Sequence, residues 1–241
     1  MLVRPHKKKA QFTGCLLCGA ELSYTVQPQR RDCSVCGKQH DANAECKAGH
    51  YVCDNCHAAG TPDRLALLRN SGEKDAWWLF EQIAARTGVH MHGPEHHVLV
   101  PCVLLTAFRN NGGELDLGEA LGLAVKRAGT VPGGACGFFG ACGAAVGAGI
   151  FAAVLTGATP MSTDDWGAAQ AVTAHALTEI AKTGGPRCCK RTARTAILAA
   201  AQFAEARFGV AIPVDDAPCV HSAANKDCLR VRCGYYGRGV E

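Results

Sequence analysis

Cysteine and histidine residues are crowded near the N-terminus in a pattern typical of metal ligands. Cys15-x-x-Cys18-Gly and Cys33-x-x-Cys36-Gly are two copies of a zinc-knuckle sequence, in which two thiolates lie on one tight turn. The glycine that follows each pair permits a left-handed residue, whose backbone N–H can point toward sulfur. The sequence therefore predicts zinc binding in this region.

A further group of ligands follows directly in CKAGHYVCDNCH, residues 46–57. The candidates are Cys46, His50, Cys53 and Cys56, with His57 as a competing imidazole. Together with the two knuckles they provide seven thiolates and one imidazole, which is enough for two closed four-coordinate sites. Closed sites leave no position for a substrate, so we expect a structural role for both zinc ions. Pairing the two knuckles with each other is the simplest arrangement, and the spacing also allows a cross-braced one.

Three cysteines near the C-terminus, Cys219, Cys228 and Cys233, stand in a basic, irregular stretch with little apolar content. Such residues are poor candidates for a hydrophobic core, which favours metal ligation. With a fourth thiolate from Cys188 or Cys189 they could hold a [4Fe–4S] cluster. With three ligands, one iron would stay open as a Lewis acid for a substrate, and zinc is the competing metal.

Two glycine-containing stretches could bring thiols to a substrate. The segment PGGACGFFGACGAAVGAG (132–149) runs into a predicted buried helix, and a thiol near the N-terminus of that helix would have a lowered pKa. We predict a reactive thiol at Cys136 or Cys142, the alternative being a packing segment with buried, inert cysteines. In GGPRCCKR (184–191), basic residues flank two adjacent cysteines and would favour thiolates or bind an anion.

The run HMHGPEHH at 90–97 contains several groups that could transfer protons. On a helix that begins near the proline, His92 and His96 could approach the same site, with Glu95 beside them. This pattern suits acid–base catalysis or metal ligation. The alternative is a polar helix start with solvated histidines.

A mainly α fold must position these residues. Helical periodicity and helix start and stop signals predict helices around 61–68, 73–87, 96–109, 116–128, 141–155, 164–182 and 187–208. Strand signals are scarce apart from a short hairpin near ELSYTV, between the two knuckles. We therefore expect a small zinc-ribbon-like module over residues 1–58, followed by an all-helical domain with a C-terminal cysteine cluster over residues 59–241.

The composition limits the class of protein. The net charge is +4, with 25 Lys+Arg against 21 Asp+Glu, which is too mild to argue for nucleic acid. The basic start MLVRPHKKKAQF is not followed by an apolar stretch, so we expect no secretory signal and a cytoplasmic protein with reduced thiols. The uncharged run 141–158 is rich in Ala and Gly, which favours a buried helix over a membrane span. Such a helix would also suit a homodimer core.

The chain contains the segments HYVCDNCH, MHGPEHHVLVPCVLL, GGACGFFGACGAAVGAGI and NKDCLRVRCGYY. Together they resemble an uncharacterised prokaryotic domain family of unknown function, over most of the chain from about residue 46. The resemblance implies occurrence in anaerobes and methanogens, sometimes beside methyltransferase domains. The architecture is more distantly similar to the helical iron–sulfur lyases of the serine dehydratase and cysteine desulfidase type, which pair a Gly/Ala-rich segment with late cluster cysteines.

These patterns favour an iron–sulfur enzyme with lyase-like or sulfur-handling chemistry on a small anionic substrate. One alternative is a zinc-binding adaptor or redox sensor that contacts a protein or nucleic acid. Its basic contacts would come from Arg4, Lys7, Lys8, Lys9, Arg30 and Arg31, which a solvated basic arm also explains. Another alternative, suggested by the family resemblance, is a methyltransferase accessory protein.

Overall fold

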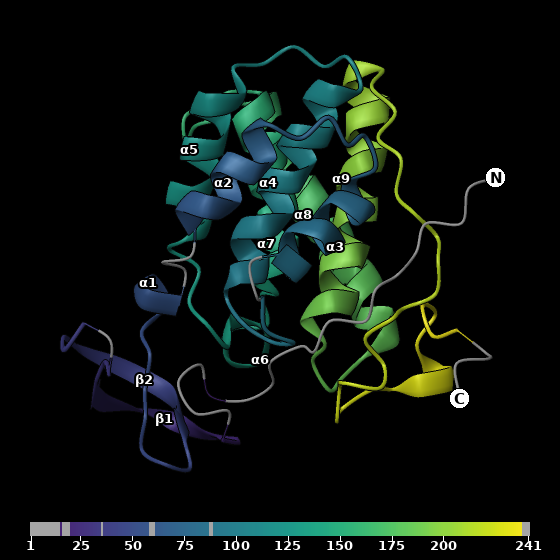
Figure 1. The fold of residues 1–241 in the computed structure, drawn as a ribbon. Helices are drawn as coiled ribbons and strands as arrows, with labels where there is room; N and C mark the ends of the chain where they lie inside the picture. The colour runs from purple at the N-terminus through teal and green to yellow at the C-terminus, as the bar shows by residue number, and fades with distance from the viewer. Residues whose placement is uncertain (1–14, 16–19, 35, 58–60, 87–88, 238–241) are drawn as a thin grey trace.

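The computed structural model describes residues 15, 20–34, 36–57, 61–86 and 89–237. Within them a two-stranded hairpin precedes a body of helices (Figure 1). The predicted mainly α fold is confirmed, and the cysteine cluster near the N-terminus is compatible with a zinc-ribbon-like module. The predicted domain boundary after residue 58 falls outside the described residues and stays a prediction.

The hairpin is built around the second knuckle. Strands β1 (Leu22–Asp32) and β2 (Gln39–Cys46) pair antiparallel, and the register shifts between Tyr24 and Gln29. The knuckle at 33–38 connects the two strands. The segment between the two knuckles is therefore one strand rather than the short hairpin that the sequence predicts.

The described helices are α1 (Asp54–His57), α2 (Thr61–Arg69), α3 (Ala76–Arg86), α4 (Glu95–Asn110), α5 (Leu117–Ala128), α6 (Ala135–Phe138), α7 (Gly143–Leu155), α8 (Asp164–Thr183) and α9 (Cys189–Phe208). Seven of the described helices correspond to the predicted ones, and two short helices, α1 and α6, are not predicted from the sequence. Local side chains fix several ends. Oδ1 of Asp116 accepts a hydrogen bond from the backbone N–H of Glu119 at 2.9 Å and caps the start of α5. Gly209, with φ of 67°, supplies the left-handed residue that ends α9.

Helix α7 is the centre of the helical body and packs against α4, α5, α8 and α9. Its small residues let the backbones approach closely. A Cβ atom on Gly147 would lie 2.9 Å from the carbonyl oxygen of His97 in α4, so only glycine fits there. The run predicted to be a buried helix thus lies in the core. Among the described residues, no helix combines the length and apolar character that crossing a bilayer requires.

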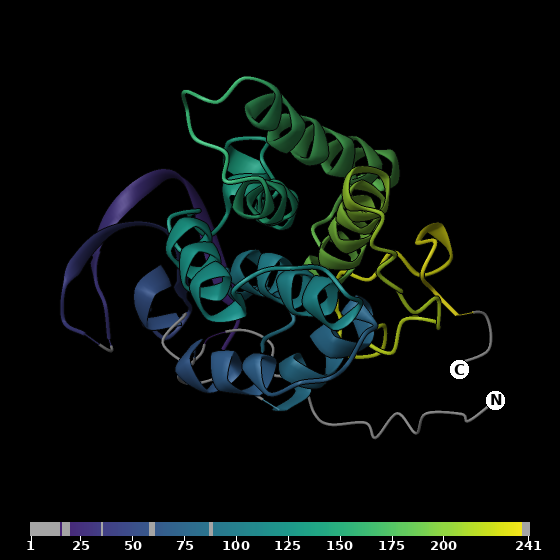
Figure 2. The same ribbon diagram turned by 90° about the horizontal axis from the view of Figure 1, so that it is seen from above.

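After α9 the chain continues as an irregular tail, residues 210–237, that lies beside α9 (Figures 1 and 2, yellow). The tail contains a short 3-10 helix, η1 (Arg230–Arg232). Arg194 of α9 holds it in place, because its guanidinium donates to the carbonyl oxygen of Ala217 at 2.8 Å and lies 4.6 Å from the ring centroid of Tyr235. These contacts fix the tail cysteines near the start of α9.

Candidate functional site

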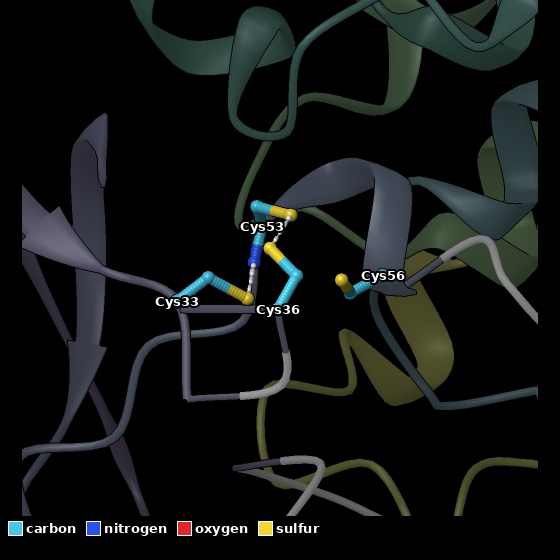
Figure 3. A group of neighbouring side chains, drawn as sticks. All are labelled: Cys33, Cys36, Cys53 and Cys56. Atoms are coloured by element: carbon cyan, nitrogen blue, oxygen red, sulfur yellow. Dashed lines mark hydrogen bonds between the residues drawn. The ribbon is translucent and has the colours of Figure 1, made fainter. Parts of the chain in front are cut away.

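Four cysteines of the N-terminal region converge on one point, and we call them the hairpin set: Cys33, Cys36, Cys53 and Cys56 (Figure 3). Their sulfur atoms all lie within 4.8 Å of one another, and those of Cys36 and Cys53 are 3.9 Å apart. Zn–S bonds of about 2.3 Å at tetrahedral angles place sulfurs about 3.8 Å apart. The geometry therefore suits a single metal ion such as zinc.

Local backbone structure explains how the hairpin set forms. The N–H of Gly37 donates to the carbonyl oxygen of Cys33 at 2.8 Å, and a φ of 69° at Gly37 closes the knuckle. The N–H of Cys53 donates to the sulfur of Cys33 at 3.3 Å, and Cys56 follows one turn later in α1. A backbone N–H that points at sulfur stabilises the thiolate form, which is the form that binds metal.

A second group, the imidazole set, consists of Cys15, Cys46 and His50. Nδ1 of His50 lies 3.5 Å from the sulfur of Cys46 and 3.9 Å from that of Cys15. The N–H of His50 also donates to the sulfur of Cys46 at 3.3 Å. Cys18, which the sequence predicts as a zinc ligand on the same knuckle as Cys15, lies outside the described residues.

The two N-terminal groups are interleaved along the chain. The sequence favours pairing the first knuckle with the second at one site, but the second knuckle instead lies beside Cys53 and Cys56. The first knuckle contributes Cys15 to the group at the end of β2. The described residues are therefore grouped as in the cross-braced alternative, because the closing turn of the hairpin lies beside α1 and the end of β2 lies beside Cys15.

Four cysteines from the start of α9 and from the tail line one small cavity, and we call them the tail set: Cys188, Cys219, Cys228 and Cys233. Among the described residues, the groups whose ligand atoms all lie within 4.8 Å of one another do not include the tail set. Its neighbour in sequence, Cys189, lines a different cavity. Cys188 is the extended N-cap residue of α9 and Cys189 the first helical residue, so the two side chains point to different places.

Backbone donors point at two sulfurs of the tail set. The N–H of His221 donates to the sulfur of Cys219 at 3.4 Å, and the N–H of Arg230 donates to that of Cys228 at 3.3 Å. Arg230 has a φ of 50°, a left-handed conformation that is unusual for a residue with a side chain. Backbone strain of this kind is concentrated at functional sites, where the surrounding structure maintains it.

Two basic side chains beside the tail set have a buried nitrogen atom with no hydrogen-bond partner in the described residues. Lys190 lines the same cavity and is 1% exposed, and its Nζ has no hydrogen-bond partner among the described residues. Burial lowers the pKa of Lys190, because the ammonium loses its hydration there. Nε of Arg194 also lacks a partner in the described part of the chain. An anionic group in the cavity would compensate both cations.

A larger cavity of about 190 Å³, the seam cavity, lies between the hairpin and the helical body. Oδ2 of Asp54 in α1 accepts a hydrogen bond from the N–H of Gly133 at 3.0 Å. Arg187 donates to the hydroxyl of Tyr24 in β1 and lies 4.7 Å from its ring centroid. The N-terminal region is therefore one wall of this cavity. Its polar lining includes His57, His92, His97, Cys136, Arg187 and Cys189.

The model of a family of unknown function, DUF5714, matches residues 65–236. The chain belongs to this family. No curated protein and no solved structure matches the chain. The DUF5714 region contains the tail set and the glycine-rich segment, whereas the hairpin and imidazole sets lie before it.

Within the DUF5714 region, the glycine-rich segment brings a thiol to the seam cavity. Cys142 is the N-cap residue of α7, close to where the sequence places it, and Cys136 lines the cavity with Cys189. Burial raises the pKa of the Cys136 thiol and raises that of Cys189 to about 12, although Arg187 acts in the opposite direction on both. A reactive thiol at Cys136 or Cys142 stays a prediction, and at Cys136 it would need a further positive charge.

The carboxylate of Glu95 contacts His57 and His90, rather than joining His92 and His96 in one site. Its Oε2 lies 3.2 Å from Nδ1 of His57, and its Oε1 lies 3.2 Å from Nδ1 of His90. Nδ1 of His96 instead contacts a backbone carbonyl oxygen at 3.0 Å. Burial lowers the pKa of His92, on the wall of the seam cavity, to about 4. The sequence does not reveal these two partners of Glu95. The contact with His57, for example, depends on how α1 packs on the helical body.

The two described basic residues of the predicted nucleic-acid contact are paired with acids. A guanidinium nitrogen of Arg30 lies 3.2 Å from Asp41, and one of Arg31 lies 2.6 Å from Glu45. The other four basic residues of that prediction lie outside the described residues. A nucleic-acid partner at the hairpin stays the alternative that the sequence leaves open.

Proposed function

We propose that this protein is an iron–sulfur protein whose cluster is held by the tail set. One observation carries the proposal: four cysteines from the start of α9 and the tail line a single cavity together with a buried ammonium that has no hydrogen-bond partner in the described residues. Of the two candidates for the fourth cluster ligand, we therefore choose Cys188, because Cys189 lines the seam cavity instead.

The charge balance supports a cluster at this place. A [4Fe–4S] core in its oxidised form, bound by four thiolates, carries a net charge of about −2. Lys190 and Arg194 would then each have an anionic neighbour, which offsets the cost of burying them. The N–H groups aimed at Cys219 and Cys228 suit bound thiolates, since hydrogen bonds to cluster sulfurs tune the reduction potential.

Four protein ligands change the chemistry that we propose for the cluster. An iron that binds substrate as a Lewis acid needs an open position, and a fourth thiolate fills it. Electron transfer is therefore favoured over the lyase-like chemistry that three ligands would allow. The substrate would bind in the seam cavity, where Arg187 could hold a small anion. The same charge opposes the effect of burial on the pKa of the Cys136 and Cys189 thiols, which would carry the sulfur-handling chemistry. Cys188 and Cys189 would connect the two sites directly.

We propose a structural role for the N-terminal region, with zinc in the hairpin set and in the imidazole set. The hairpin set has four ligands, and Cys18 of the first knuckle would close the imidazole set as its fourth ligand. The two zinc ions would hold the hairpin and α1 in the positions that complete the seam cavity.

The test is metal and acid-labile sulfide analysis of protein purified without oxygen, with a visible spectrum. We expect about two zinc ions per chain, about four iron and four sulfide, and absorption near about 400 nm. Replacing Cys228 and Cys233 by serine should remove iron and sulfide and leave zinc unchanged. Cys102→Ala, which removes a buried core cysteine of α4, is the matched control and should keep all three elements.

Two outcomes would contradict the proposal. One is a colourless wild-type protein that holds zinc alone even after reconstitution with iron and sulfide. The other is a Cys228→Ser, Cys233→Ser double variant that retains its full iron content.

A further inference from the structure

Three side chains meet at the wall of the seam cavity. His57 ends α1, His90 precedes α4, and Glu95 is the first residue of α4. Their ligand atoms all lie within 4.8 Å of one another. No cysteine takes part, so this group differs in ligand chemistry from the hairpin, imidazole and tail sets.

Little of these three side chains is exposed to solvent, so their polar atoms need partners. The side chain of Glu95 is 1% exposed, that of His90 is 9% exposed and that of His57 is 17% exposed. Oε1 of Glu95 has Nδ1 and the backbone N–H of His90 as neighbours, at 3.2 and 3.3 Å. The other oxygen, Oε2, is buried without a hydrogen-bond partner in the described residues.

The unsatisfied oxygen faces an equally unsatisfied nitrogen. Nδ1 of His57 lies 3.2 Å from Oε2 of Glu95, within ion-pair distance, but both atoms are buried and neither has a partner with good hydrogen-bond geometry among the described residues. Buried polar atoms normally have a partner, and an orphaned carboxylate oxygen is especially costly. A cation bound by both atoms would satisfy them together. Gly93 keeps the space open for the carboxylate, because a Cβ there would lie 1.9 Å from Oε2.

We propose that His57, His90 and Glu95 bind a divalent transition-metal ion, separate from the zinc and iron of the cysteine sets. Two imidazoles and one carboxylate are a ligand set for catalytic zinc and for non-haem iron. Three protein ligands leave at least one coordination position for water or a substrate. His57 and Gly93 line the seam cavity, so the ion lies at the wall of that cavity. This proposal does not depend on the iron–sulfur cluster.

The electrostatics predict weaker binding here than in the cysteine sets. Arg64 is buried, and its positive charge acts on both Glu95 and His57, which opposes a second cation. Nitrogen and oxygen ligands also hold zinc less tightly than thiolates do. A mild chelator should therefore empty this site first. Because His57 directly follows Cys56, zinc in the hairpin set would hold one of the three ligands in position.

The experiment is a Co²⁺ titration of the full-length protein after brief treatment with EDTA, with zinc analysis to confirm that the cysteine sets stay loaded. Uptake is measured by metal analysis after desalting and by electron paramagnetic resonance of high-spin Co²⁺. We expect about one Co²⁺ per chain, bound without loss of zinc. Glu95→Gln should weaken binding by at least about 100-fold. His175→Gln, which removes an exposed imidazole of α8, should leave binding unchanged.

A second variant guards against a folding defect in Glu95→Gln. His57→Gln removes a less buried ligand and should also lose Co²⁺, with helical circular dichroism and zinc content retained. Wild-type protein that takes up no Co²⁺ would overturn the proposal and leave Glu95 as a hydrogen-bonding bridge between α1 and α4. Undiminished uptake in folded Glu95→Gln and His57→Gln would overturn it as well.

Discussion

The hairpin set and the tail set each contain four cysteines, yet the protein builds them differently. The hairpin set draws its ligands from a knuckle and a short helix, and its sulfurs lie within 4.8 Å of one another. The tail set takes one ligand from the N-cap of α9 and three from an irregular tail, and its sulfurs form no such compact group. One metal ion fits the first arrangement, and for the second we propose a larger polynuclear centre.

The two sets also differ in how much hydrophobic core surrounds them. The hairpin set belongs to a small hairpin with little core of its own, where a bound metal would supply stability that burial cannot. The tail set lies against a fully formed helical body, beside Lys190 and Arg194. A fold that already has a core does not need a metal to hold it together. In the described residues, the Nζ of Lys190 and the Nε of Arg194 have no hydrogen-bond partner, and this supports our proposal of an anionic cofactor at this place.

The largest expected effect tests the interleaved pairing. Cys33 and Cys53 belong to one set in the structure and to two different sets if the knuckles pair sequentially. The Cys33→Ser, Cys53→Ser double variant should therefore lose about one zinc ion, and loss of that ion should unfold the hairpin at a cost of several kcal/mol. Zinc analysis with thermal unfolding measures both. Loss of two zinc ions would support the sequential pairing, and Cys102→Ala should lose none.

The next effect compares two adjacent cysteines that face different cavities. Cys188→Ser removes a ligand of the tail set and should lose iron and sulfide, or keep a labile three-thiolate cluster that air destroys. Cys189→Ser alters the seam cavity and should keep its iron. Iron content and absorbance after a timed exposure to air separate the two variants. Equal loss from both would show that the two side chains serve one site.

Much of the fold can be predicted from the sequence because its signals are local. Apolar periodicity and caps such as Asp116 and Gly209 place most helices within a few residues of their observed ends. The signal for candidate metal ligands is also local, because each knuckle carries its own glycine. The pairing of the knuckles is not a local property, because it depends on which turn of the hairpin lies beside α1.

The long-range parts of the candidate site could not be found in the same way. Glu95 attracts attention in the sequence beside His96, but helical geometry and the packing of α1 turn its carboxylate toward His57 and His90. In the sequence, Lys190 has the pattern of one charge in a polar helix start, and only the fold shows that it is buried. Such contacts join segments far apart in the chain, so no spacing rule reveals them.

A smaller effect concerns the stability of the protein, and its sign should differ between the metal-free and the iron-loaded form. Lys190→Met removes a buried ammonium that has no hydrogen-bond partner in the described residues. The metal-free protein should become more stable, by about 1–3 kcal/mol, because the uncompensated charge is gone. The iron-loaded protein should become less stable and its reduction potential should fall, because a cation that favours the more negative reduced cluster is lost.

Unfolding of the two forms in the same buffer checks this reversal, and a redox titration checks the potential. Lys182→Met removes an exposed lysine paired with Glu179 and should change neither quantity appreciably. A change of the same sign in both forms would place the anionic centre elsewhere.

The smallest expected effect concerns the link between the regions that carry the two sets. Asp54 accepts a hydrogen bond from the N–H of Gly133, which joins α1 to the glycine-rich segment. Asp54→Ala should lower the free energy of unfolding by about 1 kcal/mol, and Asp54→Asn, which keeps an acceptor oxygen, by less. The sharper measurement is hydrogen exchange, since the Gly133 amide should exchange faster in Asp54→Ala. If that rate stays at the wild-type value while zinc remains bound, the hairpin does not close the seam cavity through this contact.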